Sequence, residues 1–144
     1  MKAIVCRPVQ DAAELEQYYN LRCRVFVEEQ GLFSDTDRDA YDEQAIHIVA
    51  LRGASVVGAV RVYEESDGVY QGGRLAVEKK FRGRVGRLLV HKAVEIVQQR
   101  QARTFKALIQ QENIDFFKNL KWTATGAAVR YKDKLHQMME ADLG

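Results

Sequence analysis

The sequence predicts a mixed α/β fold, in which helices lie on the faces of a mixed sheet. Short β-branched runs alternate with segments of helical period, in the order strand, helix, three strands, helix, strand, helix and two strands. The 144 residues, 47% of them hydrophobic, suffice to bury a core without disulfides or metals. Because no linker, repeat or composition break divides the chain, we expect a single domain over residues 1–144.

One strand and one helix are expected first. Residues 2–9 form a strand-like run, and Pro8 near its end favours an edge position in the sheet. Asp11 followed by Glu14 matches a capping box, which opens a helix running to about Glu29. Its apolar residues fall on one helical face: Leu15, Tyr18, Leu21 and Val25.

The middle of the chain predicts a loop and three strands. Residues 31–44 are polar, acidic and aperiodic, as expected of a loop. Two β-branched runs, 45–52 and 55–64, flank a Gly-Ala pair and predict a hairpin. A third strand follows over 69–78, where Gly72-Gly73 indicates a bulge or a close backbone approach.

The second half is expected to alternate helices and strands. A basic loop, a helix, a strand, a short helix and two final strands are predicted over residues 79–85, 86–101, 104–110, 113–120, 123–131 and 135–142. The last segment also has helical propensity, and we assign it as a strand because a further antiparallel partner would complete the sheet.

Charge is distributed unevenly along a nearly neutral chain. The net charge is +2, which argues against a protein that coats nucleic acid. Residues 28–43 carry seven acids and one base, whereas residues 74–92 carry seven bases and one acid, leaving the histidine neutral. The two segments are either solvated surface stretches or two sites, one for an anionic and one for a cationic ligand.

Other features bound the function class. No apolar run is long enough for a membrane helix, and the N-terminal residues lack the apolar core of a signal peptide. Cys6 and Cys23 show no CxxC spacing, so a reduced, cytoplasmic protein is expected. The hydropathy and the net charge predict that it has no membrane or nucleic-acid partner. The spacing of Asp35, Asp37 and Asp39 resembles the start of an EF-hand calcium loop. An EF-hand is excluded, because Ala40 and Ile46 stand where that loop requires Gly and Glu. No metal site is expected.

The segment Gly73–Val90 has the order strand, basic glycine-containing loop, helix. Free N–H groups and the positive end of the helix dipole meet at such a helix start, which makes it an anion site. Gly83 and Gly86 let the backbone approach a phosphate, and Arg82, Arg84 and Arg87 add positive charge. The sequence contains neither a P-loop nor a GxGxxG dinucleotide motif.

With its surroundings, this segment resembles the GCN5-related N-acetyltransferase (GNAT) superfamily. Arg74-Leu75-Ala76-Val77 is similar to the fourth strand of that family, and the run from Arg82 to Leu89 is similar to its signature loop and helix start. The resemblance implies a mostly antiparallel sheet that splays between strands 4 and 5, with helices on both faces. It also implies that acetyl-CoA binds in the split, with its pyrophosphate on the loop amides.

Two further stretches extend the resemblance. Leu21–Gln30, followed by Asp35 and Asp37, resembles the ElaA-like branch, in which an acidic loop follows the first helix. Gln110, followed by Phe116–Trp122, is similar to the FYxxxGF segment of the family. Three motifs in the correct order are more specific than any one of them.

The chain departs from the family pattern at three points. The signature loop is one residue short, since Val85 directly follows Arg84 where a further glycine is usual. Phe117 stands where the family often has a tyrosine whose hydroxyl protonates the leaving thiolate. Lys121 stands where the family often has glycine.

The resemblance implies a set of cofactor-binding residues. They are Leu75, Ala76, Val77, Arg82, Gly83, Arg84, Val85, Gly86, Arg87, Gln110 and Phe117. The implied mechanism is direct attack of an amine on the thioester, with a backbone N–H near Ala76–Val77 stabilising the oxyanion.

Two residues are candidates for the proton acceptor, Glu29 and His47. An acid at a helix end is disfavoured by the dipole, and the resemblance points to Glu29, whose pKa could be raised in a partly buried cleft. His47 shares a strand face with Val49 and Leu51, which favours a structural histidine over a base.

The expected function is acetyl-CoA-dependent N-acetylation of a small-molecule or peptide amine. The resemblance also implies a possible homodimer, which is common in the family. The acidic segment favours a cationic acceptor. One alternative is an autoinducer-type acyltransferase that uses acyl carrier protein; it shares the pattern Arg22-x-x-Val25-Phe26 and an acidic stretch, but a longer chain is usual. Another is a non-catalytic module that binds CoA or nucleic acid.

Overall fold

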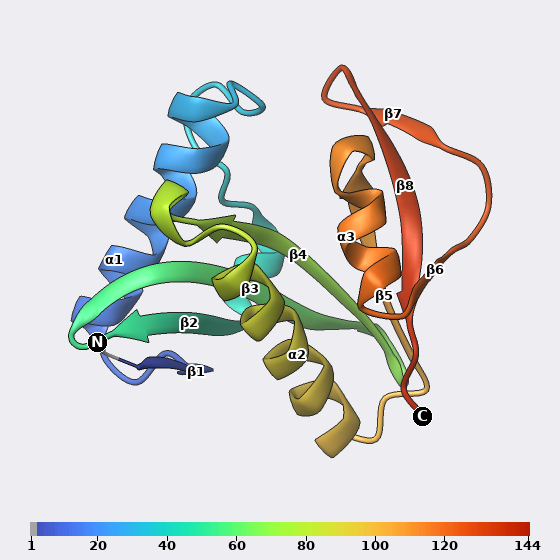
Figure 1. Cartoon of the computed structure of the whole chain (residues 1–144), viewed down its shortest axis with the longest axis horizontal. Helices are drawn as coiled ribbons and strands as arrows, with labels where there is room; N and C mark the ends of the chain where they lie inside the picture. The colour runs from blue at the N-terminus through green and yellow to red at the C-terminus, as the bar shows by residue number, and fades with distance from the viewer. Residues whose placement is uncertain (1–2) are drawn as a thin grey trace.

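An open eight-stranded sheet forms the centre of the molecule in the computed structural model, which describes residues 3–144 (Figure 1). The spatial order of the strands is β1-β2-β3-β4-β5-β8-β6, and β7 pairs with β8. All strand pairs are antiparallel except β4 with β5. The strands are β1 (Ile4–Pro8), β2 (Ile46–Arg52), β3 (Ser55–Ser66), β4 (Val69–Val77), β5 (Thr104–Gln110), β6 (Trp122–Ala124), β7 (Val129–Tyr131) and β8 (Lys134–Ala141).

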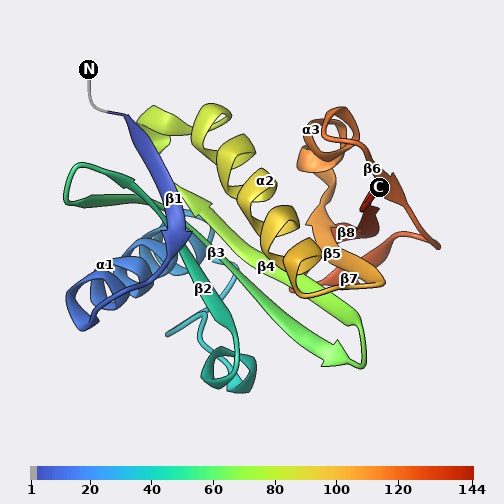
Figure 2. The same cartoon turned by 90° about the horizontal axis from the view of Figure 1, so that it is seen from below.

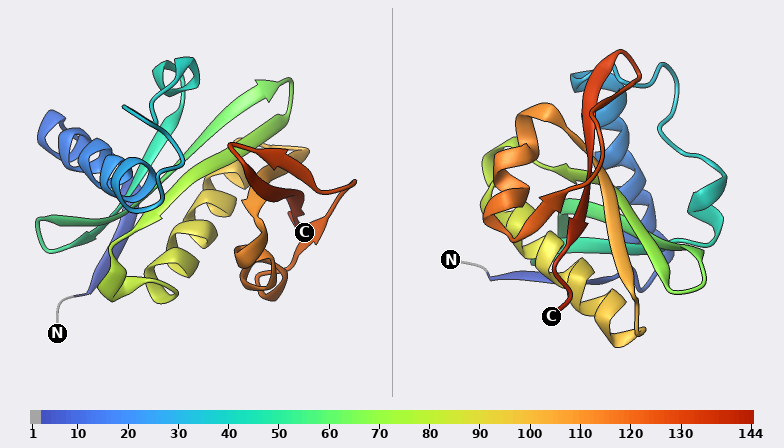
Figure 3. Two further views of the ribbon diagram at one scale, coloured as in Figure 1. Left: turned by 90° about the horizontal axis from the view of Figure 1, so that it is seen from above. Right: turned by 90° about the vertical axis from the view of Figure 1, so that its right-hand side faces the viewer.

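Helices cover both faces of this sheet (Figures 2 and 3). One face carries α1 (Ala12–Cys23), with Tyr18 and Leu21 in its buried cluster. The other face carries α2 (Arg84–Gln99) and α3 (Ile114–Asn119). The predicted mixed fold with helices on both faces is therefore confirmed.

The first helix is shorter than predicted. Asp11 caps α1 as expected by accepting a hydrogen bond from the Glu14 N–H, and the Glu14 side chain accepts from Gln10 N–H and Arg7. After Cys23 the chain continues as one wider turn of π-helix, η1 (Arg24–Glu29), rather than as regular α-helix. Such turns are rare and frequent at functional sites. Lys2, part of the first predicted strand, lies outside the described residues.

The predicted bulge in β4 is confirmed, one residue later than the glycine pair. Arg61 of β3 pairs with Gly73, but Ala59 pairs with Ala76, so that Arg74 and Leu75 together lie opposite Val60. Arg74 adopts a positive φ of 55°, which a non-glycine residue holds only under local constraint.

The sheet splits between β4 and β5. Their parallel pairing runs from Val69↔Thr104 to Gly72↔Ala107 and then stops. Beyond that point β5 remains paired with β8, whereas β4 remains paired with β3. Figure 1 shows the two strands diverging toward the start of α2. The edges that face each other across the split carry backbone groups without a strand partner.

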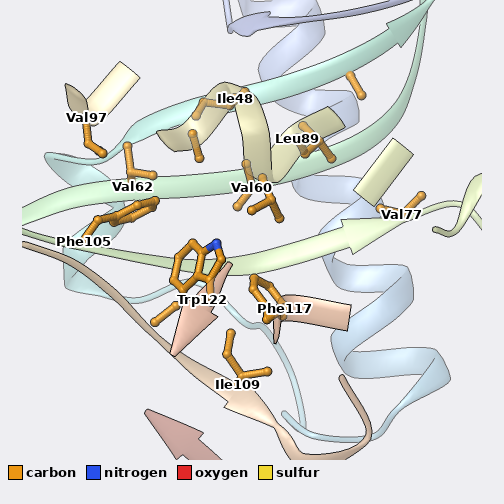
Figure 4. Packing of buried hydrophobic residues seen from close by; sticks show 14 of the residues in the cluster. Ile48, Val60, Val62, Val77, Leu89, Val97, Phe105, Ile109, Phe117 and Trp122 are labelled. Atoms are coloured by element: carbon orange, nitrogen blue, oxygen red, sulfur yellow. The ribbon is translucent and has the colours of Figure 1, made fainter. Parts of the chain in front are cut away.

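The main core lies between α2 and the sheet (Figure 4). Leu89 and Val97 of α2 pack on Val60 and Val62 of β3 within this buried cluster. Gly58 permits the close approach, because a Cβ atom there would lie 2.7 Å from Leu89 Cδ1.

Two boundaries in the second half differ from expectation. Helix α2 begins at Arg84, two residues before the predicted start, because Gly83 takes a positive φ of 88° and turns the chain into the helix. The predicted strand 123–131 is two short strands, β6 and β7, separated by a bend at Gly126. The final segment is a strand, as assigned.

Candidate active site

A cleft of about 370 Å³ lies where β4 and β5 diverge. It is lined from both faces of the sheet, by Phe26 and Phe33 on the α1 side and by Val90 and Trp122 on the α2 side. This volume falls within the range of small-molecule sites, roughly 300–1,000 Å³. The cleft therefore passes through the sheet at the split.

The start of α2 is a candidate anion site, because its first amides are free of intrahelical partners. The first helical amides, from Arg84 to Gly86, precede the first intrahelical bond, which Arg87 N–H donates to the Gly83 carbonyl. A Cβ atom at Gly83 would meet nothing within 4 Å. Four exposed cations surround this turn and form no ion pair with residues 3–144: Lys79, Lys80, Arg84 and Arg87.

The anion site adjoins the cleft. A Cβ atom at Gly86 would lie 3.5 Å from the ring of Phe116, and the adjacent Phe117 lines the cleft. On the opposite side, Leu75 lines the cleft, and Val77 at the end of β4 accepts a hydrogen bond from Arg82 Nε. A ligand whose anionic group binds at the α2 N-terminus can thus extend into the cleft between β4 and β5.

Arg82 and Glu29 are bound to each other. Two guanidinium nitrogens of Arg82 donate to the two carboxylate oxygens of Glu29, at 2.7 and 2.6 Å. This hydrogen bonding holds the pKa of Glu29 below its usual range. The expectation of a raised pKa for Glu29 is therefore wrong, because its charged form is the stabilised one. Glu29 is also not among the residues that line the cleft.

His47 has both ring nitrogens engaged. Nε2 lies 2.9 Å from the carbonyl oxygen of Asp42, so it carries the proton and donates. Nδ1 lies 2.8 Å from the Tyr18 hydroxyl and accepts its hydrogen bond. Burial lowers the pKa of His47, which favours the neutral ring. These contacts are those of a structural histidine.

The acidic loop is only partly solvated: Asp37 and Asp42 are buried, whereas Asp35, Asp39 and Glu43 stay exposed. Arg22, which is fully buried, donates to Asp37 at 2.7 Å and to Asp42 at 2.8 Å. Arg61 bonds Asp39 through two nitrogens, at 2.6 and 2.9 Å, and Arg74 also donates to Asp39. Three arginines thus neutralise three aspartates, because a buried charge is costly unless it is paired.

The other predicted cofactor residues divide into two groups. Leu75, Gln110 and Phe117 line the cleft. Gln110 donates to the side chain of Gln30 at 3.0 Å and so connects β5 with η1 across the cleft. Ala76 and Val77 are buried in the two core clusters instead, and the bulge that could free a backbone N–H lies just before them, at Arg74–Leu75.

Comparison with known proteins agrees with this geometry. The model of the Acetyltransferase (GNAT) family matches residues 13–122. The chain belongs to the GNAT acetyltransferase family. The fold of this GNAT chain is similar to a putative N-acetyltransferase from Lactobacillus plantarum, at 24% identity and a TM-score of 0.88, covering 98% of this chain and 99% of the other.

Two further solved structures share the fold. Escherichia coli ElaA matches at 22% identity and a TM-score of 0.85, over 99% of this chain and 100% of that one. The AHL synthase LasI matches at 12% identity and a TM-score of 0.82, over 100% of this chain and 92% of that one. The resemblance to an ElaA-like GNAT protein is therefore confirmed at the level of the fold.

Sequence reasoning missed one cleft residue of this GNAT chain, His136. It is 4% exposed and lines the cleft from β8, opposite Gln110 of β5. Its Nδ1 lies 2.9 Å from the Lys134 carbonyl oxygen and therefore carries the proton. Within residues 3–144, Nε2 makes no hydrogen bond and keeps a free lone pair. Only the strand register and the fold of β7 over β8 bring this side chain to the cleft, so no local sequence signal marked it.

No helix within residues 3–144 is long and apolar enough to cross a membrane. No group of three or more His, Cys, Asp or Glu side chains in this range is arranged to hold a metal ion.

Proposed function

We propose that this GNAT chain is an N-acyltransferase that uses acetyl-CoA to acetylate a primary amine by direct attack. The observation that carries the proposal is the position of the unobstructed α2 N-terminus beside the cleft between β4 and β5. The match to the family model supports an acyl transferase, and the cleft supplies a place for a thioester.

In this proposal the cofactor lies along the split. The pyrophosphate binds the free amides from Arg84 to Gly86, where the helix dipole and the exposed cations favour negative charge. The pantetheine arm runs between the unpaired edges of β4 and β5, whose backbone groups can bond its amides. Leu75, Gln110 and Phe117 contact it from the two walls.

The transfer step proceeds at the β4 bulge. The amine nitrogen attacks the thioester carbonyl carbon, a C–N bond forms, and the C–S bond then breaks to release the CoA thiolate. A backbone N–H of Arg74 or Leu75, taken out of the regular ladder by the bulge, stabilises the oxyanion. Phe117 offers no hydroxyl to the leaving sulfur, so the thiol leaves as thiolate.

His136 takes the proton of the amine in this proposal. His136 lines the cleft and its Nε2 makes no hydrogen bond within residues 3–144, whereas Glu29 is bound to Arg82 and both nitrogens of His47 are engaged. A neutral imidazole with a free nitrogen can accept a proton directly or through one water. Positioning of the amine beside the thioester supplies most of the remaining acceleration.

The acceptor is a small-molecule or peptide amine in this proposal. Asp37, Asp39 and Asp42 are paired with arginines, whereas Asp35 and Glu43 are exposed and form no ion pair within residues 3–144. The expected preference for a cationic amine therefore rests on fewer charges than the sequence count indicates. Arg61 also lines the cleft. Its buried Nε atom has no hydrogen-bond partner among residues 3–144.

Calorimetric titration of acetyl-CoA tests the cofactor site. Wild-type protein should bind acetyl-CoA in the micromolar range, and Arg84→Ala/Arg87→Ala should bind it roughly tenfold or more weakly, since each lost phosphate contact removes a charge-assisted bond. Arg100→Ala removes an exposed charge at the C-terminal end of α2, the opposite end of the helix, and should bind like wild type.

The alternatives give different results in the same experiment. Binding of acyl carrier protein without binding of acetyl-CoA would favour an autoinducer-type enzyme. Steeply salt-dependent binding of nucleic acid, with no CoA binding, would favour a nucleic-acid module. CoA binding without acylation of any amine would favour a non-catalytic CoA-binding module.

A further inference from the structure

The two faces of the split sheet give the cleft two chemically different halves. On the α1 face the lining includes charged side chains, among them Asp39, Arg61 and Arg74. On the α2 face the lining residues carry no charge and belong to the main hydrophobic core: Val60, Val90, Ala93, Phe105, Ala107, Ile109, Phe117 and Trp122. A ligand that passes through the split therefore meets a polar half and an apolar half.

The apolar half extends along the split to its closed end. Ala107 forms the last register pair with Gly72, and Phe105 precedes it on β5. The bulge at Arg74–Leu75 lies between this closed end and the α2 N-terminus. A thioester at the bulge, with its pyrophosphate on α2, thus directs its acyl carbon atoms toward the apolar half.

Aromatic rings form the inner wall of this half. The ring of Trp122 lies 5.2 Å from that of Phe105 and 5.1 Å from that of Phe117, centroid to centroid (Figure 4). A Cβ atom at Gly72 would lie only 3.0 Å from the Phe105 ring, so the ring packs against β4 because this residue is glycine. Ala93 of α2 and Ala107 of β5 are the smallest side chains in the lining and leave room between the larger ones.

We propose that this apolar half is an acyl-chain subsite, and that besides acetyl the enzyme accepts neutral, saturated acyl groups longer than acetyl. The inference rests on the proposed function, because it takes the thioester to lie at the bulge. Buried methylene groups gain free energy by leaving water, whereas a charged acyl group has no partner in this half. The aromatic wall limits the chain length, so affinity stops rising at a defined number of carbons.

The test compares the dissociation constants of CoA and of acetyl-, butyryl-, hexanoyl-, octanoyl- and succinyl-CoA by calorimetry. Each methylene that becomes buried should tighten binding roughly fourfold, so butyryl-CoA, with two more methylenes, should bind roughly fifteenfold tighter than acetyl-CoA. The gain should end at one of the longer chains. Succinyl-CoA should bind no tighter than acetyl-CoA.

Ala93→Leu locates the subsite. The larger side chain fills the apolar half, so the preference for butyryl-CoA over acetyl-CoA should disappear while the affinity for CoA itself stays unchanged. Val94→Leu adds volume at the next residue of α2, outside the cleft lining, and should keep the wild-type preference. Ala93→Val is a smaller change that keeps the test available if Ala93→Leu does not fold.

The outcomes separate this inference from the proposed function. Equal affinities for acetyl-, butyryl- and hexanoyl-CoA would overturn the subsite and leave the acetyltransferase proposal standing. Succinyl-CoA binding tighter than butyryl-CoA would place the acyl group on the arginine face and overturn the subsite as well. A chain-length preference retained in both Ala93 variants would refute its location, and failure of CoA itself to bind would remove both proposals.

Discussion

Replacement of Arg22 by methionine tests the strongest physical constraint on the candidate site. Arg22 is fully buried, and its guanidinium donates to Asp37, Asp42 and the Tyr18 hydroxyl. Methionine keeps much of the apolar stem but removes the charge and every one of these bonds. Two buried carboxylates then lose their principal partner.

The expected loss of stability is about 3 kcal/mol. Breaking a buried ion pair costs about 3–5 kcal/mol, because the remaining charge is left in a poorly solvated place. Each carboxylate retains a second guanidinium, with Arg61 3.0 Å from Asp42 and Arg74 3.4 Å from Asp37, which places the cost at the lower end. For a domain of this size the midpoint of thermal unfolding should fall by roughly 6–12 °C.

The cost of Arg22→Met should shrink in acid. Burial alone would raise the pKa of Asp42, but hydrogen bonds from Arg22, from the Asp39 N–H and from Arg61 hold it well below its usual range. A folded-state pKa below the unfolded value contributes stability above the unfolded pKa, near 3.9, which is lost as pH falls toward the folded value. Arg22→Met has less of this contribution to lose. Its free energy of unfolding should therefore approach that of the wild type below about pH 4.

Urea unfolding near neutral pH and well below pH 4, at about pH 3, measures both effects, with Arg24→Met as the matched control. Arg24 lies two residues further along and forms a half-exposed pair with Glu78, so its loss should cost less than about 0.5 kcal/mol. Two results would refute the reasoning: a cost for Arg22→Met no larger than that for Arg24→Met, or a cost that does not change with pH.

Three further substitutions test other parts of the structure. Gly58→Ala should lose about 1–3 kcal/mol in urea unfolding, because its methyl group would press on Leu89; unchanged stability would mean that α2 packs less closely than described. His136→Gln should lower kcat, measured by thiol release, by roughly 10²–10⁴-fold with unchanged acetyl-CoA affinity. Glu29→Gln should leave kcat nearly unchanged in that assay, and a large loss would return the role of base to Glu29.

Local patterns in the sequence predicted most of the fold. The Asp11 cap, the β2–β3 hairpin and the strand–loop–helix order around Gly83 depend on residues close together in the chain, and all three are present. The π-helical turn after Cys23 was not predictable from apolar spacing, because the period of the sequence does not distinguish it from a regular helix.

The candidate site was predicted only where its residues share one segment. The candidate anion site at α2 consists of adjacent glycines and arginines, so the sequence alone indicated it. The pairing of Arg82 with Glu29 joins residues 53 positions apart, and the ion pairs of Arg22 with the acidic loop depend on tertiary packing. A count of charges along the chain could not show that these opposite charges neutralise each other.

His136 illustrates the same limit from the opposite side. Its neighbours in the sequence carry no catalytic pattern, and it reaches the cleft through the pairing of β8 with β5 and β7. Register across strands distant in sequence is set by the packing of the whole sheet.

A crystal structure with acetyl-CoA bound tests the proposed cofactor site most directly. The expected result places the pyrophosphate oxygens within hydrogen-bond distance of the amides of Arg84–Gly86 and the thioester between β4 and β5 at the Arg74–Leu75 bulge. Acetyl-CoA bound on any other surface, with the cleft between β4 and β5 left vacant, would contradict the proposed acyl-transfer site.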